Sequence, residues 1–198
     1  MVFARLSAVI ALALLAAACL PVTTTSPVGT TTGLAADPAL TGLWKGHGDK
    51  PSDTIYAFFF PQSGATTSAV LLRPAAKDGA KDGGWGHYTF ETTTLGPYKF
   101  MNAHELSSDG KPSDEDAAKK SFPLLYRVNG DGALVIYLVD EKRARAAIKA
   151  GKIQGTVDPT DYGDVVITAS GADLDAFLQT PDGRALFVKP LAILKKEK

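Results

Sequence analysis

The feature that most constrains the fold is a succession of short β-type segments in the first half of the chain, separated by glycine, proline and aspartate. Such segments, each bounded by turn-forming residues, are typical of an antiparallel sheet or barrel. The sequence therefore predicts strands at Leu43–Gly48, Thr54–Phe60, Ser68–Arg73, Trp85–Thr93 and Tyr98–Leu106.

Alternation within these segments indicates how the sheet faces the solvent. Tyr88 and Phe90 fall on one side of their strand, with His87 and Glu91 on the other. This pattern is typical of an antiparallel sheet with one solvated face. The run DTIYAFFF, residues 53–60, is apolar on both sides and favours a more central strand.

The second half of the chain combines a hairpin with short helices. Asn129-Gly130-Asp131-Gly132 is the strongest hairpin signal, because asparagine and glycine tolerate the positive φ of tight turns. It predicts that Phe122–Val128 pairs antiparallel with Leu134–Val139. Helix starts are expected at Asp140, Ser170 and Thr180, and a terminal strand at Leu186–Leu194. The expected class is strand-dominated α+β: an antiparallel sheet or small closed or half-closed barrel with two or three short helices in the C-terminal half.

The N-terminus has the layout of a secretory signal peptide. Arg5 precedes an apolar run from Leu6 to Ala18, which ends in the small residues Ala16-Ala17-Ala18. The run is too short to cross a bilayer as a stable helix. Residues 1–18 are therefore expected to be removed on export.

Cys19 is the only cysteine of the chain and follows those alanines directly. Ala16-Ala17-Ala18-Cys19 resembles the lipobox of bacterial lipoproteins, although leucine stands at position 15 and not three places before the cysteine. The resemblance implies an acylated Cys19 and, because Leu20 follows and not aspartate, an outer-membrane location facing the periplasm. Ordinary signal-peptidase cleavage after Ala18 is the alternative.

The organisation predicted after the signal peptide has two parts. Residues 19–39 are rich in threonine, proline and glycine and have almost no charge, so a flexible, lipid-anchored tether is expected. Residues 40–198 form one globular β-rich domain. The whole chain carries 21 lysine and arginine residues against 21 aspartate and glutamate residues, and this neutrality argues against a nucleic-acid partner.

Two short motifs connect the domain to known families. Gly42-Leu43-Trp44 resembles the Gly-x-Trp motif of lipocalins and other calycin barrels, and Thr160-Asp161-Tyr162 resembles their Thr-Asp-Tyr motif. The resemblance implies a small barrel in which Gly42 permits close packing and Trp44 plugs one end. It departs in having no arginine in Leu191–Leu194 to stack on the indole.

A wider resemblance is to uncharacterised proteobacterial envelope lipoproteins. It is carried by the segments GKIQGTV, residues 151–157, and GRALF, residues 183–187, and by the helix around Asp173–Leu178. This resemblance implies an envelope location and assigns no catalytic residue.

The sequence offers no established catalytic or metal motif. His47, His87 and His104 lie in different predicted strands without ligand spacing, so no metal site and no cofactor are expected. Neither Gly-x-Ser-x-Gly nor a phosphate-binding glycine loop is present. A candidate functional face is formed by Trp85, His87, Glu91 and His104.

These observations predict a non-catalytic envelope lipoprotein that binds a small apolar or amphipathic ligand, or another envelope component. The first alternative is a hydrolase that pairs His87 or His104 with a carboxylate such as Glu91 or Glu105. The second is a purely structural domain.

Overall fold

The computed structural model describes residues 22–48, 53–75, 83–115, 119–159 and 163–197. The signal segment, Cys19 and Thr160-Asp161-Tyr162 lie outside these ranges, so the expectations attached to them stay predictions.

Eight strands of the described chain form a closed antiparallel barrel. Their order is β5-β4-β3-β2-β12-β9-β8-β6, and pairing of β5 with β6 closes the ring. The strands are β2 (Gly42–His47), β3 (Thr54–Pro61), β4 (Thr66–Arg73), β5 (Gly84–Leu95), β6 (Tyr98–Ser108), β8 (Phe122–Val128), β9 (Ala133–Leu138) and β12 (Pro190–Lys196). The expected strand-dominated fold and its barrel are confirmed.

The hairpin predicted from Asn129–Gly132 is present. β8 pairs antiparallel with β9, from Leu124 opposite Leu138 to Val128 opposite Leu134. Gly132 has φ +78°, the left-handed backbone that only glycine and a few other residues adopt without strain. The turn chemistry therefore determined this register locally.

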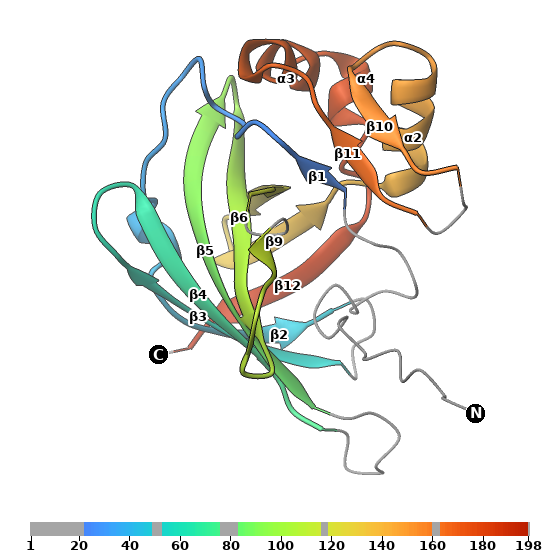
Figure 1. The fold of residues 1–198 in the computed structure, drawn as a ribbon. Coiled ribbons are helices and arrows are strands. Elements are labelled where there is room, and N and C mark those ends of the chain that lie inside the picture. The colour runs from blue at the N-terminus through green and yellow to red at the C-terminus, as the bar shows by residue number, and fades with distance from the viewer. Residues whose placement is uncertain (1–21, 49–52, 76–82, 116–118, 160–162, 198) are drawn as a thin grey trace, which may run out of the picture.

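A small unit is inserted between β9 and β12 and lies beside the barrel in Figure 1. It contains α2 (Glu141–Lys149), β10 (Gly155–Val157), β11 (Val165–Ile167), α3 (Gly171–Leu178) and α4 (Pro181–Arg184). The side chains of Asp140, Ser170 and Thr180 cap the three helices, as predicted. The terminal strand starts at Pro190 and not at Leu186, because Leu186 follows α4 into the core of the small unit.

Apolar residues form two cores. One fills the barrel and includes Trp44, Phe59 and Phe90. The other lies between the small unit and the outer face of the barrel, where Phe100 of β6 contacts Phe187 edge to face. The small unit thus covers one side of the barrel.

The flexible tether expected at residues 19–39 is wrong from Val22 onward. Val22 and Val28 are fully buried, and β1 (Thr23–Thr24) pairs in parallel with β11. Asn102 of β6 exchanges two hydrogen bonds with the backbone of Val28, at 2.7 and 2.8 Å. The threonines that suggested a solvated linker satisfy their polar groups against the folded domain instead.

Asp175 of α3 holds the middle of this N-terminal segment. Its carboxylate, 1% exposed, accepts hydrogen bonds from the backbone N–H of Gly29 at 2.7 Å and of Thr31 at 2.8 Å. The hydroxyl of Thr31 donates a third at 2.6 Å. The segment then follows the barrel past β5 to the short 3-10 helix η2 (Pro38–Leu40), which leads into β2 (Figure 1).

Candidate functional site: an apolar cavity in the barrel

The barrel interior contains a cavity of about 130 Å³. Its lining is apolar except for the phenol of Tyr88 and the carboxylate of Glu105. The lining residues are Ile55, Phe59, Ala69, Leu71, Tyr88, Phe90, Met101, Ala103, Glu105, Phe122, Leu124, Ile136, Leu138, Leu191, Ala192 and Leu194.

Alternation along the strands positions these side chains. Met101, Ala103 and Glu105 are every second residue of β6, so they point to the same side of the sheet, and Tyr88 and Phe90 do the same on β5. The space exists because several of the inward positions, including Ala69, Ala103 and Ala192, carry only a methyl group. Larger side chains there would fill the barrel, as they do at its Trp44 end.

One end of the barrel is closed by Trp44. Its indole is 2% exposed and donates a hydrogen bond to the backbone carbonyl of Leu40 in η2 at 2.6 Å. Gly42 has φ +123°, and a Cβ atom there would approach Lys196 Cε to 2.9 Å. The ammonium of Lys196, on the last strand, lies 5.6 Å from the centre of the indole ring. Lys196 of β12 thus contacts the indole where the calycin resemblance would place an arginine.

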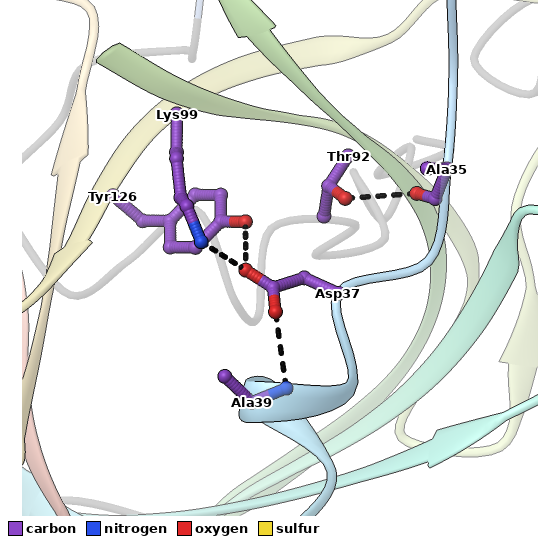
Figure 2. Close-up of polar contacts among 6 residues, drawn as sticks. All are labelled: Ala35, Asp37, Ala39, Thr92, Lys99 and Tyr126. Carbon is purple, nitrogen blue, oxygen red and sulfur yellow. Dashed lines mark hydrogen bonds and ion pairs between the residues drawn. The ribbon is translucent and has the colours of Figure 1, made fainter. Parts of the chain in front are cut away.

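A charged cluster supports the same closed end (Figure 2). Asp37 Oδ2 accepts hydrogen bonds from Lys99 Nζ and from the Tyr126 hydroxyl, each at 2.7 Å, and Asp37 Oδ1 accepts one from the N–H of Ala39 at 3.0 Å. Burial would raise the pKa of the Asp37 carboxyl, but these donors outweigh it and hold the pKa below its usual value. Burial, and then the charge and hydrogen bond of Asp37, raise the pKa of Tyr126. The cluster ties the N-terminal segment to β6 and β8.

The opposite end of the cavity is the more open one. The lining residues toward Trp44, such as Phe59, Phe90 and Met101, are buried. Those toward the other end, such as Phe122 and Glu105, are only partly buried. The cavity is therefore more accessible from the Glu105 side.

Two hydroxyl groups orient the Glu105 carboxylate. Tyr88 donates to Oε2 at 3.0 Å, and Ser113 donates to Oε1 at 3.2 Å. A turn at Asp109 and Gly110, both with positive φ, folds β7 (Lys111–Pro112) back on β6 and brings Ser113 to this place. Burial, followed by the charge of Glu105, raises the pKa of Tyr88, so its phenol stays protonated and donates.

The four residues predicted as a functional face lie outside the cavity. Trp85, His87 and Glu91 alternate with Tyr88 and Phe90 on β5 and face away from the barrel interior. His104 is paired with Thr89 on the same outer face, and its Nδ1 lies 3.1 Å from the carbonyl of Lys120. The alternation predicted that Trp85, His87 and Glu91 share a side, but the cavity is on the other one.

Three of the four histidine–carboxylate combinations of the hydrolase alternative are held apart. The fourth, His104 with Glu91, is a diagonal cross-strand pair on the outer face, because His104 lies opposite Thr89. His87 and Glu91 are four residues apart on one strand, a distance of roughly 13 Å along the sheet. His104 and Glu105 are consecutive, so their side chains point to opposite faces. Within the described residues, no group of three or more histidine, cysteine, aspartate or glutamate side chains has the arrangement to hold a metal ion.

Tyr88 and Glu105 were not predicted from the sequence as members of one site. Glu105 was expected only as a partner for a histidine, whereas the structure places it in the apolar lining. Alternation contained the signal for Tyr88, which shares its side of β5 with Phe90. A β-bulge shifts the register of β5 against β6 between His87 and Tyr88 and places Glu105 opposite Tyr88. No local sequence pattern predicted this bulge.

Fold and site together define an eight-stranded antiparallel barrel closed at one end by tryptophan, with an apolar cavity that ends in a hydroxyl-bound carboxylate. No family model, curated protein or solved structure matches the chain. In the described part of the chain, no helix has the length and apolar character needed to cross a bilayer.

Proposed function

We propose that this chain is a non-catalytic binding protein of the bacterial cell envelope, and that its barrel holds the apolar part of a small apolar or amphipathic molecule. The observation that carries the proposal is the cavity of about 130 Å³ with its almost wholly apolar lining. Concave apolar sites with a few placed polar groups are the usual form of small-molecule sites.

The volume limits the size of the bound part. An apolar cavity of about 150 Å³ in another protein accepts benzene, so the present cavity suits one small ring or a short alkyl chain. Sites for drug-sized ligands are larger, at about 300–1,000 Å³. The ligand therefore inserts an apolar end and keeps its head group near Glu105.

The envelope location is supported by the signal-like residues 1–18 and by the lipobox resemblance at Cys19, with the outer membrane facing the periplasm as the proposed site. Cys19 precedes the buried Val22 by three residues, which span at most about 11 Å. A lipid on Cys19 would hold the barrel close to the bilayer surface, without the spacing that a long tether would provide.

The proposal of a non-catalytic role is supported by the position of His87 and His104 on the outer face of the barrel, away from the apolar cavity. General acid–base catalysis needs groups within hydrogen-bond reach, directly or through one water. The pairs His87–Glu91 and His104–Glu105 do not offer this, because of their places on the strands. His104 and Glu91 are diagonal neighbours, but they lie on the outer face and not at the cavity.

Native mass spectrometry of the protein purified from its own membranes tests the binding function. The expected result is an added mass on the wild type that is absent from Ala103→Leu, because the leucine fills the cavity. The matched control is Ala146→Leu, the same change at an exposed position of α2, which should keep the added mass. Equal occupancy of both variants would show that any bound molecule lies elsewhere, and the cavity would lose its role.

A second candidate function, contact with another envelope component, is favoured by an apolar patch on the outer face of the barrel. Leu43 pairs with Phe58, and Leu72 pairs with Trp85. These four side chains are 40% to 47% exposed. Exposed apolar patches of this kind often mark interaction sites. Crosslinking in membranes should detect a partner that the double variant Phe58→Ser, Trp85→Ser loses and that Ala103→Leu keeps.

A further inference from the structure

Glu105 is the one charged side chain among the described residues that line the cavity. A carboxylate beside apolar surface is costly unless it is hydrogen-bonded, and here each oxygen accepts one bond from a neutral hydroxyl, of Tyr88 or Ser113. A carboxylate oxygen has two lone pairs, so each oxygen keeps capacity for a further donor. The bound carboxylate is therefore oriented and still able to accept a hydrogen bond from a ligand.

Two other charged residues lie on strands or turns at this end of the barrel, Asp109 and Arg73. Asp109, on the turn after β6, is close enough for its negative charge to contribute to the raised pKa of Tyr88. Arg73 lies two positions beyond the lining residue Leu71 on the same side of β4, at the end of the strand, and does not itself line the cavity. Nearest the apolar space, the charge is negative.

We propose that Glu105 selects the head group of the ligand: the site takes amphiphiles whose head is an ammonium or another hydrogen-bond donor and discriminates against carboxylates. This inference rests on the proposed binding function. The apolar end occupies the space beside Met101 and Ala103, and the head lies against the carboxylate that Tyr88 and Ser113 hold. A ligand carboxylate would meet like charge there, whereas an ammonium forms a charge-assisted hydrogen bond.

The test uses three probes with one tail: hexylamine, 1-hexanol and hexanoate. The chain has two methionines, Met1 and Met101, and Met101 lines the cavity. A ¹³C-methyl methionine label in the full-length protein, held in lipid nanodiscs at neutral pH, therefore gives two signals, of which that of Met101 reports occupancy of the cavity. The expected result is that hexylamine binds at least about tenfold more tightly than hexanoate, with 1-hexanol between them.

Glu105→Gln should reduce the ratio of hexylamine to hexanoate affinity to within about threefold. Glu91→Gln is the matched control, since it removes the same charge from the outer face of β5, and it should keep the wild-type ratio. Wild-type protein that binds hexanoate as tightly as hexylamine would overturn the head-group inference and leave the binding function standing. That comparison needs no variant, so it holds even if Glu105→Gln fails to fold. If no probe shifts the Met101 signal, both the binding function and the inference fail.

Discussion

Trp44→Ala is the substitution expected to lower the free energy of unfolding most. The indole is 2% exposed inside the barrel, and its N–H is the hydrogen-bond donor to the carbonyl of Leu40, a fully buried residue. Truncation removes the apolar contacts of the ring and leaves that carbonyl without its donor. Both losses act at the closed end of the barrel, where η2 enters β2.

The magnitude follows from these contacts. Replacing a buried tryptophan by alanine costs about 3–5 kcal/mol, and an unpaired buried carbonyl places the value toward the upper end, at about 4–5 kcal/mol. The ammonium of Lys196 adds only about 0.5 kcal/mol, since that side chain is exposed. Trp44→Phe keeps most of the ring and should cost less, about 1–2 kcal/mol for the lost N–H donor. In a domain of this size, the loss in Trp44→Ala corresponds to a Tm lower by about 8–20 °C.

Urea denaturation followed by circular dichroism measures the free energy of unfolding of each variant. Trp85→Ala is the matched control, because the chain has two tryptophans and Trp85 is 40% exposed on the outer face. It should lose less than about 1 kcal/mol. Equal losses in Trp44→Ala and Trp85→Ala would refute the role of Trp44 as the structural plug of the barrel.

Three further predictions follow from other contacts. Asp175→Ala should lower the free energy of unfolding by about 3 kcal/mol and speed amide exchange in residues 25–33. The control Asp182→Ala, at an exposed ion pair, should change the free energy of unfolding by less than about 1 kcal/mol. The pKa values of Tyr88 and Tyr126 are raised in the folded state, so the contribution of these phenols to stability is complete below the unfolded pKa of about 10 and falls as the pH rises above it. In alkaline denaturation, the double variant Tyr88→Phe, Tyr126→Phe should therefore lose stability less steeply with rising pH than the wild type does. Mass spectrometry of the mature N-terminus should show acyl groups on Cys19, and Cys19→Ala should leave the membrane fraction or stay unprocessed; wild-type protein without lipid mass would contradict this.

The sequence predicted the elements whose causes are local. The hairpin between β8 and β9 depends on the turn residues Asn129–Gly132, and the helices α2 and α3 depend on the caps Asp140 and Ser170. Each of these signals involves residues a few positions apart, so it needs no knowledge of the rest of the fold. The pattern of apolar and polar residues on β5 likewise separated its two faces correctly.

The N-terminal segment shows where composition misleads. Threonine, proline and glycine suggested a solvated linker, because such residues bury little apolar surface by themselves. In the fold, Asn102 and Asp175 supply hydrogen-bond partners to its backbone from 74 and 146 residues away. Residues so distant in the sequence cannot be paired by any local rule, and the order of this segment is a tertiary effect.

By itself, the sequence determined the class of fold, because alternation, turn residues and caps act through the backbone within a few residues. It also placed Gly42 and Trp44 at the start of the barrel. Only the tertiary structure decided which face of β5 and β6 encloses space, since closing the ring makes one side of every strand the interior. That closure, together with alanine at positions 69, 103 and 192, created the cavity and set Glu105 at its open end, where charge and apolar surface meet.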